Sequence, residues 1–274
     1  THCQKVYQGY TTKIEKDVVI STWQSIYKMP KKYFEQFGCV IGDEAHLFKS
    51  KSLTNIMTKL HLCKYRFGLT GTLDGTQTHR LVLEGLFGEV EKVISTKELI
   101  DNKTLANLNI ECIVFKHKEE DCKLVKDYTY ADEINYLVLQ PNRNNFISRL
   151  CNSLKGNTLC LYQLVEKHGT ALYGLMKDFD RKVFFVHGGT DAKTRNDIRG
   201  IVEKEKNAII IASYGTFSTG INIRNINNVV FSSPSKSRIR ILQSIGRGLR
   251  RSSIKDTIRL FDLSDDLSYK SKMN

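Results

Sequence analysis

The second half of the sequence alternates short apolar runs with amphipathic segments, and this alternation limits the fold more than any other feature. Each run is long enough for one buried strand, and apolar residues between and before the runs recur at helical spacing. The runs are residues 158–162, 183–187, 208–212, 228–232 and 257–263, and the helical sets are Leu172, Leu175, Met176, Phe179 and Ile147, Leu150, Cys151, Leu154. Buried strands that alternate with helices form βαβ units. This half therefore predicts an α/β fold with a parallel sheet.

The first half repeats this pattern with fewer strands. Residues 17–22, 39–42 and 66–70 predict three strands of one sheet. A helical stripe between the last two consists of Leu53, Ile56, Met57 and Leu60. Three strands make a thin sheet, and the chain begins THCQKVYQ without an initiator Met or an apolar leader. We therefore expect a fragment of a longer protein, with its first domain truncated at the N-terminus.

The boundary between the halves is predicted near residue 100. The segment from Ser95 to Glu98 has the pattern of a capping box that opens a short helix. A mixed stretch rich in Lys, Asp and Glu follows at 101–142. The predicted domains are residues 1–100 and 101–274.

Charge and cysteine usage narrow the class of protein. The 274 residues carry a net charge of +13, which favours nucleic acid as a partner, although a solvated basic surface would give the same number. No apolar run approaches the roughly 20 residues of a membrane-spanning helix. The seven cysteines include no Cys-x-x-Cys pair, which indicates reduced thiols of a cytosolic protein, with Cys39 and Cys160 in core positions, and disfavours zinc.

An acidic pair, Asp43 and Glu44, follows the apolar run 39–42. Ligands of parallel α/β sheets bind beyond the carboxyl ends of the strands, where this pair lies. Asp43 is the candidate ligand of magnesium (Mg2+), and Glu44 is the candidate base for an attacking water. His46 is the candidate link to the neighbouring sheet. A surface turn that spells Asp-Glu-Ala-His by chance is the alternative.

Two further hydroxyl-rich segments follow predicted strands. Thr70, Gly71 and Thr72 end the run 66–70 and could report the state of an acidic neighbour, although a plain β-turn explains them equally well. A Gly- and hydroxyl-rich loop at 213–222 could offer backbone N–H groups to phosphates. Gly215 and Gly220 have P-loop spacing, but Ile and Asn follow instead of Lys and Ser or Thr. No G-x-x-x-x-G-K-S/T loop occurs in the 274 residues.

The segment Gln243-Ser-Ile-Gly-Arg-Gly-Leu-Arg-Arg carries the strongest signal. On a helix, Gln243, Arg247 and Arg250 share one face. Planar guanidinium groups suit a γ-phosphate whose charge spreads in the transition state. A basic helix face in contact with solvent or nucleic acid is the alternative, but Gly246 and Gly248 lower helix propensity without benefit to such a face.

These four segments, in this order over two sheets, resemble superfamily 2 helicases. Residues 43–46 resemble motif II, 70–72 motif III, 218–220 motif V and 243–250 motif VI. The runs VVISTWQSI, YFEQFG, ASYGTFSTGI and LQSIGRGLRR resemble the recombination and repair helicases of phages more closely. The ordered set covers most of the chain and is far more specific than any single motif.

The resemblance implies two RecA-like domains that face each other across an ATP cleft, with ATP and Mg2+ as ligands. Arg247 and Arg250 would be arginine fingers, with Arg250 the first choice. Nucleotide would also be bound by Asp43, His46, Gly220 and Gln243, and Thr70, Gly71 and Thr72 would couple the sites. Backbone contacts to nucleic acid would come from Thr22, Trp23, Gln24, Gln163, Ser218 and Thr219. The partner would be branched or forked DNA, in the cytoplasm of the host cell if the gene is a phage gene.

The sequence also departs from the family. Motif I, which holds the phosphates, would precede residue 1, and Asn222 stands where many members carry Asp. The resemblance also implies an amino-terminal DNA-binding domain like that of the phage helicases, and we expect none within these 274 residues. We therefore expect the isolated chain to bind ATP poorly and to hydrolyse little of it. A DNA-binding protein without hydrolysis, the motor of a restriction or repair nuclease, and an RNA substrate stay open as alternatives.

Overall fold

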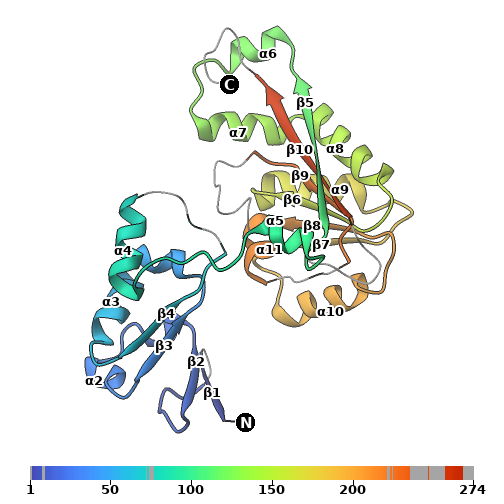
Figure 1. Ribbon diagram of the computed structural model, residues 1–274. Coiled ribbons are helices and arrows are strands. Elements are labelled where there is room, and N and C mark those ends of the chain that lie inside the picture. Colours follow the sequence, from blue (N-terminus) through green and yellow to red (C-terminus); the bar gives the residue numbers. More distant parts are fainter. Residues whose placement is uncertain are drawn as a thin grey trace. The chain divides into compact units, whose positions relative to one another are not determined.

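The structure, a computed structural model, describes residues 2–7, 10–71, 73, 77–220, 223, 225–234, 246 and 257–267. The chain divides into two compact units, Thr1–Val93 (unit 1) and Ile94–Asn274 (unit 2). Figure 1 shows both units. The division falls a few residues before the boundary expected near residue 100.

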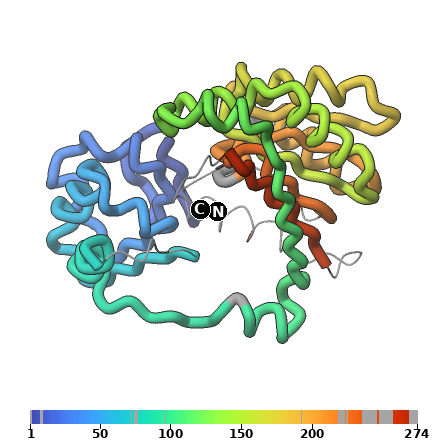
Figure 2. Tube along the Cα trace, turned by 90° about the horizontal axis from the view of Figure 1, so that it is seen from above, coloured from blue at the N-terminus to red at the C-terminus, as the bar shows by residue number. Residues whose placement is uncertain are grey.

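Unit 2 is built on a six-stranded parallel sheet, as the alternation of apolar runs predicts. Its strands are β5 (Asn107–Lys116), β6 (Thr158–Tyr162), β7 (Val183–Val186), β8 (Ile209–Ser213), β9 (Asn228–Phe231) and β10 (Thr257–Asp266). Their order in the sheet is β5-β10-β9-β6-β8-β7. Figure 2 shows β10 (red) beside β5 (green), and the two strands pair from Thr257↔Asn107 to Asp266↔Lys116. Five strands match predicted runs, and β5 is an addition at the sheet edge.

Helices cover both faces of this sheet. They are α5 (Thr96–Asp101), α6 (Glu119–Leu124), α7 (Tyr130–Leu139), α8 (Pro141–Ser153), the π-helical turn η2 (Val165–Gly169), α9 (Thr170–Met176), α10 (Ala192–Val202) and α11 (Tyr214–Gly220). Helices α8 and α9 pack Ile147 and Leu172 against one face. Helices α10 and α11 pack Val202 and Phe217 against the other. Burial of both faces explains why the central strands β6, β8 and β9 are apolar runs without alternation.

The capping box predicted at Ser95 is confirmed. The Glu98 backbone N–H donates to Ser95 Oγ at 3.1 Å, and the Ser95 backbone N–H donates to a Glu98 carboxylate oxygen at 2.6 Å. The reciprocal bonds satisfy two donors that the first turn of α5 would otherwise leave unpaired.

Unit 1 contains two small parallel sheets instead of the single sheet expected. Its elements are β1 (Cys3–Val6), β2 (Val18–Ser21), α1 (Trp23–Ile26), α2 (Lys31–Phe34), β3 (Cys39–Gly42), the 3-10 helix η1 (Ala45–Lys49), α3 (Lys51–Lys59), β4 (Tyr65–Gly68) and α4 (Gln77–Phe87). Among the described residues, β2 pairs with β1, and β3 pairs with β4. A cavity of about 170 Å³ lies between β2 and β3, lined in part by Ile26 and Tyr33.

The core of unit 1 lies on one side of its strands. Phe34, Phe48, Met57 and Leu83 from the helices form this core, with Val40 of β3 packed against it. The other side exposes apolar residues, namely Val18, Ile20, Ile41, Phe67 and Leu69. Cys160 is buried as predicted, but the prediction for Cys39 is wrong, because this residue begins β3 on the exposed side. All seven cysteines are free thiols.

None of the helices in the described ranges has the length and apolar character needed to span a bilayer.

Candidate active site

The acidic pair lies where β3 ends, on the tight turn into η1. Asp43 is exposed and Glu44 is partly buried. The Glu44 backbone N–H donates to Asp43 Oδ1 at 2.9 Å. Glu44 has a φ of 50°, in the left-handed region that costs a residue with a Cβ free energy. Strain of this kind persists where the surroundings fix the backbone, and it gathers at functional sites.

His46 joins the acidic pair to the neighbouring strand. Its side chain is buried, and its Nδ1 lies 3.0 Å from Thr70 Oγ1 and 3.3 Å from Glu44 Oε2. Backbone bonds hold the two strand ends together: the Ala45 N–H donates to the Leu69 oxygen at 2.8 Å, and the Leu69 N–H donates to the Gly42 oxygen at 2.8 Å. The structure thus brings Asp43, Glu44, His46 and Thr70 into one cluster, with Gly71 next to it. Thr72 lies outside the described residues.

Two glycines, Gly42 and Gly68, fix the strand ends beneath this cluster. They are partners in the register of β3 and β4. A Cβ on Gly42 would lie 2.8 Å from Phe48, and one on Gly68 would lie 2.9 Å from Phe87. The aromatic rings therefore pack directly on the backbone that carries the site. Neither glycine was among the predicted site residues, although Gly42 ends the predicted strand 39–42 and Gly68 lies within the predicted strand 66–70.

The cluster fits a magnesium ion that is held mainly by phosphates and water. Mg2+ is usually bound through one or two carboxylates together with substrate phosphates. Asp43 offers an exposed carboxylate at the carboxyl end of β3. No group of three or more His, Cys, Asp or Glu that could hold a metal is found in the described part of the chain, and a phosphate-bound ion needs none.

The predicted phosphate loop after β8 is a helix, α11. Ser213 Oγ accepts the Thr216 backbone N–H at 3.2 Å, and Tyr214 and Phe217 are buried three residues apart. Packing of these rings outweighs the low helix propensity of Gly215. Gly220 ends α11, which also contains Ser218 and Thr219. Gln243, Arg247 and Arg250 lie outside the described residues.

A second candidate region is an open hollow of about 640 Å³ at the carboxyl ends of β6, β7 and β8. It is lined by Gln163, Leu164, Val165, Gly188, Arg195, Ser213, Tyr214, Gly215 and Thr216. Among the described residues, Gln163 Oε1 and Arg195 Nε are buried atoms without a hydrogen-bond partner. The guanidinium of Arg195 gives this hollow a cationic group, which suits an anionic ligand.

A buried polar network holds the loop that carries Gln163. The Gln163 backbone N–H donates to Ser233 Oγ at 3.1 Å. His168 lies between Ser233 Oγ, at 2.8 Å from Nδ1, and Asn144 Oδ1, at 3.1 Å from Nε2. Burial, reinforced by the charge of Arg143, lowers the pKa of His168 to about 3. The imidazole is therefore neutral at physiological pH and acts as a fixed hydrogen-bonding strut.

Thr22, Trp23 and Gln24 follow β2 directly and are exposed. Thr22 Oγ1 lies 2.9 Å from Ser25 Oγ.

Arg195, by contrast, was not among the predicted site residues. It stands on α10, eight positions after the end of the run 183–187. The rule that parallel sheets bind ligands at their carboxyl ends would have singled out this segment.

Two family models match the chain. The model described as type III restriction enzyme, res subunit, matches residues 2–75, which lie in unit 1. The model described as helicase conserved C-terminal domain matches residues 142–252, which lie in unit 2.

Curated relatives match along nearly the whole chain. The ATP-dependent DNA helicase uvsW of Enterobacteria phage T4 is 36% identical over 263 residues, which are 95% of this chain and 52% of the relative. The putative ATP-dependent helicase IRC3 of Saccharomyces cerevisiae is 24% identical over 269 residues, which are 90% of this chain and 37% of the relative. The chain thus spans about half the length of the first relative and less of the second.

Solved structures agree with these matches. The crystal structure of T4 UvsW aligns with a TM-score of 0.52 at 33% identity, over 100% of this chain and 55% of that chain. A fragment of a putative HsdR subunit of a type I restriction enzyme from Vibrio vulnificus YJ016 aligns with a TM-score of 0.71 at 18% identity, over 96% of this chain and 50% of that chain. The second likeness shows the fold alone, which is the RecA-like α/β fold expected. Since family models match both units and the T4 relative matches 95% of the sequence, the chain belongs to the superfamily 2 helicases.

Proposed function

We propose that this chain forms motor parts of an ATP-dependent DNA helicase that remodels branched DNA in recombination and repair. The observation that carries the proposal is the cluster of Asp43, Glu44, His46 and Thr70 at adjoining strand ends. A protein that only binds DNA needs neither a strained backbone at Glu44 nor a buried histidine beside its carboxylate. The likeness to the T4 helicase supports DNA as the substrate.

The roles follow from the geometry of the cluster. Asp43 would hold Mg2+, which neutralises charge on the phosphates during transfer. Glu44 would orient the attacking water and accept its proton, and His46 Nδ1 lies 3.3 Å from that carboxylate. Contact between His46 and Thr70 would pass the state of the site to the end of β4. Arg247 and Arg250 keep their proposed role as arginine fingers.

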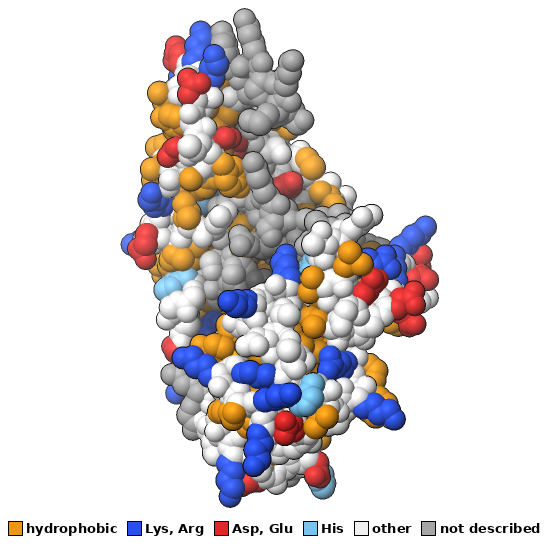
Figure 3. Space-filling model, turned by 90° about the vertical axis from the view of Figure 1, so that its left-hand side faces the viewer, with side chains coloured by type: hydrophobic (Ala, Val, Ile, Leu, Met, Phe, Trp, Pro, Cys, Tyr) orange, Lys and Arg blue, Asp and Glu red, His pale blue; other side chains and the backbone are white. Residues whose placement is uncertain are grey.

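Nucleic acid would follow the carboxyl ends of the strands in each unit. In unit 2, Gln163 and Arg195 would contact its backbone from the hollow described above. In unit 1, residues 22–66 hold eight Lys or Arg against three Asp or Glu. Figure 3 shows Lys and Arg (blue) outnumbering Asp and Glu (red) over the lower half of the face in view. Such an excess favours contact with phosphates.

The test is the substitution Glu44→Gln in the full product of the gene that encodes this chain. We expect DNA-stimulated ATP hydrolysis to fall at least about 100-fold, because a general base contributes that much or more. Binding of nucleotide should persist, because the amide preserves the shape of the side chain. Glu35→Gln, an exposed glutamate of the same unit, is the matched control and should leave turnover unchanged. Full turnover in Glu44→Gln would refute the proposal and favour a DNA-binding protein without hydrolysis.

A restriction motor is the second candidate, because the family model that matches residues 2–75 describes a subunit of a restriction enzyme. The two candidates differ in their product. A helicase leaves both DNA strands intact after unwinding, whereas a restriction complex cuts them. Incubation of the full gene product with a labelled forked DNA and ATP, analysed on denaturing and native gels, separates the two.

A further inference from the structure

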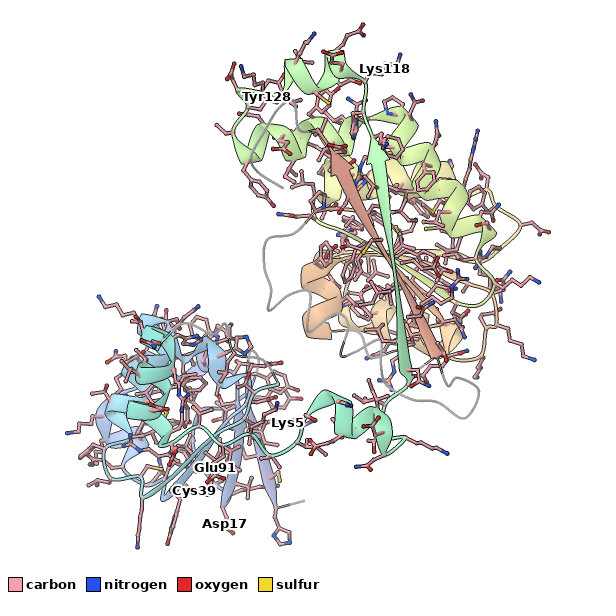
Figure 4. All side chains as sticks on the ribbon, turned by 45° about the horizontal axis from the view of Figure 1, so that its top comes forward. Lys5, Asp17, Cys39, Glu91, Lys118 and Tyr128 are labelled. Carbon is pink, nitrogen blue, oxygen red and sulfur yellow. The ribbon has the colours of Figure 1, made fainter. Side chains whose placement is uncertain are left out.

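Three exposed aromatic residues gather at the carboxyl end of the β1–β2 sheet. In the register of these strands Val6 is the partner of Ser21, so Tyr7 and Trp23 follow at the same edge. The Tyr10 backbone N–H donates to the Tyr7 oxygen at 2.9 Å. In Figure 4, Asp17 marks the amino end of this sheet and Lys5 lies toward the carboxyl end. We call Tyr7, Tyr10 and Trp23 the aromatic edge.

The rings of the aromatic edge are only partly buried by the rest of the protein. Tyr7, Tyr10 and Trp23 are 38%, 53% and 37% exposed. Tyr7 and Tyr10 pack on each other with ring centroids 4.4 Å apart. Trp23 touches Tyr27 edge-on, with centroids 5.7 Å apart and planes at 67°. Single exposed apolar residues are ordinary on protein surfaces, whereas a group of large exposed rings at one sheet edge is typical of an interaction site.

The chemistry around the edge identifies that partner as a polyanion with flat, stackable groups. Strand alternation places Lys5 on the same face of β1 as Tyr7, and Lys5 is exposed. Lys28 Nζ lies 5.6 Å from the centroid of the Tyr27 ring. Thr22 and Ser25 add hydroxyl groups beside Trp23. Aromatic rings beside cations and hydroxyls are the composition of sites that stack unpaired bases and contact their phosphates.

We propose that the aromatic edge stacks unpaired bases of single-stranded DNA, with Trp23 as the main platform. The inference rests on the proposed function and deepens it, because the family resemblance implies only a backbone contact at Trp23. Base stacking tolerates any sequence, since every base has a flat face. It also distinguishes a strand with bases from one without them, which a backbone contact does not.

The experiment exploits the fact that Trp23 is the only tryptophan of the 274 residues. The full chain is titrated at low salt with a short 3′-labelled oligothymidylate and with an abasic oligonucleotide of the same length. Anisotropy of the label measures binding, and the intrinsic emission of Trp23 measures stacking. We expect quenching of Trp23 by the oligothymidylate alone, although both strands bind. Binding of both strands without quenching would overturn the stacking proposal and leave the proposed function standing. If neither strand bound, the DNA-binding part of the proposed function would fail as well.

Variants separate stacking from a structural role. Trp23→Ala should weaken binding of the oligothymidylate about tenfold and leave binding of the abasic strand unchanged. Trp23→Phe, which keeps a ring, should restore most of the affinity. Tyr65→Ala is the matched control, because Tyr65 is an exposed aromatic of the same unit at the amino end of β4. An equal loss for both strands in Trp23→Ala would show that the ring only shapes the protein and would overturn the proposal. Loss of thymidylate affinity in Tyr65→Ala would do the same.

Discussion

At the scale of single residues, the site depends on a backbone conformation that its side chain does not favour. Glu44 has a φ of 50°, and the bond from the Ala45 N–H to the Leu69 oxygen holds the turn from the other strand. A left-handed conformation costs a residue with a Cβ about 1–2 kcal/mol. Here it turns the chain so that a carboxylate follows a strand end directly. At this residue the protein loses some free energy of folding, and in return the carboxylate lies directly at the strand end.

The free-energy cost of this backbone conformation can be measured by comparing Glu44→Gly with Glu44→Ala. Both variants lack the carboxylate and should lack activity, but only glycine adopts a positive φ without strain. We expect the free energy of unfolding to be about 1 kcal/mol higher for Glu44→Gly than for Glu44→Ala. Urea denaturation of both proteins at one pH provides the comparison. Equal stabilities would show that the turn is not strained.

His168 should make the stability of unit 2 depend on pH. Burial lowers its pKa in the folded state to about 3, whereas an unfolded histidine titrates near 6.5. As the pH falls below about 6.5, the unfolded state binds a proton that the folded state does not, so stability is lost on acidification. The loss should reach about 2 kcal/mol at pH 5 relative to pH 7. His168→Gln should remove this part of the pH dependence in urea titrations, and an unchanged slope would contradict the assignment.

At the scale of elements, close contact between a helix and two strand ends sets the geometry of the site. Phe87 of α4 lies against Gly68 so closely that an added Cβ would be 2.9 Å from its ring. Gly85, on the same helix, has open space around it. Gly68→Ala should therefore lower the free energy of unfolding by about 1–3 kcal/mol. Gly85→Ala should raise it by about 1 kcal/mol through helix propensity. Thermal unfolding of the two variants should shift in opposite directions.

Helix α10 offers a matched pair of arginines one turn apart. Arg195 lines the hollow, whereas the Arg199 guanidinium pairs with Glu203 at 3.3 Å. Arg195→Ala should weaken DNA binding and reduce the slope of log K against log salt by about one. Arg199→Ala should change neither quantity. Anisotropy titrations at several salt concentrations check both variants, and equal slopes for the two would exclude a phosphate contact at Arg195.

Which elements the sequence predicts depends on how their residues are buried. Strands β6, β8 and β9 are buried on both faces, so they appear as apolar runs. Strand β5 lies at the edge, where only every second residue is shielded, and its mixed composition conceals it. Helix α11 was expected to be a loop, because its burial of Tyr214 and Phe217 depends on the sheet beneath it. Local patterns do not contain that tertiary contact.

At the scale of the whole molecule, the sequence predicts the fold class and the order of motifs, but not the contacts between distant segments. Asp43 and Thr70 were both singled out by their positions after strands. The bond geometry between His46 and Thr70 follows from the pairing of β3 with β4, which no spacing along the chain encodes. The same holds for Arg195 and Gln163, which come together only when β6 and β7 take their places on either side of β8.

The position of β10 has a consequence for how the protein is made. This strand lies between β5 and β9, and Arg259 on it binds Glu111 on β5 across 148 residues of sequence. A ribosome therefore completes β5 long before the partner strand has been synthesised. Until then β5 has no place in the sheet, and closing so long a loop is slow. The nascent chain must keep a ten-residue apolar-containing strand from pairing with the wrong neighbour. Slow translation after β5 or a shortage of chaperones should therefore lower the yield of correctly folded unit 2 more than that of folded unit 1.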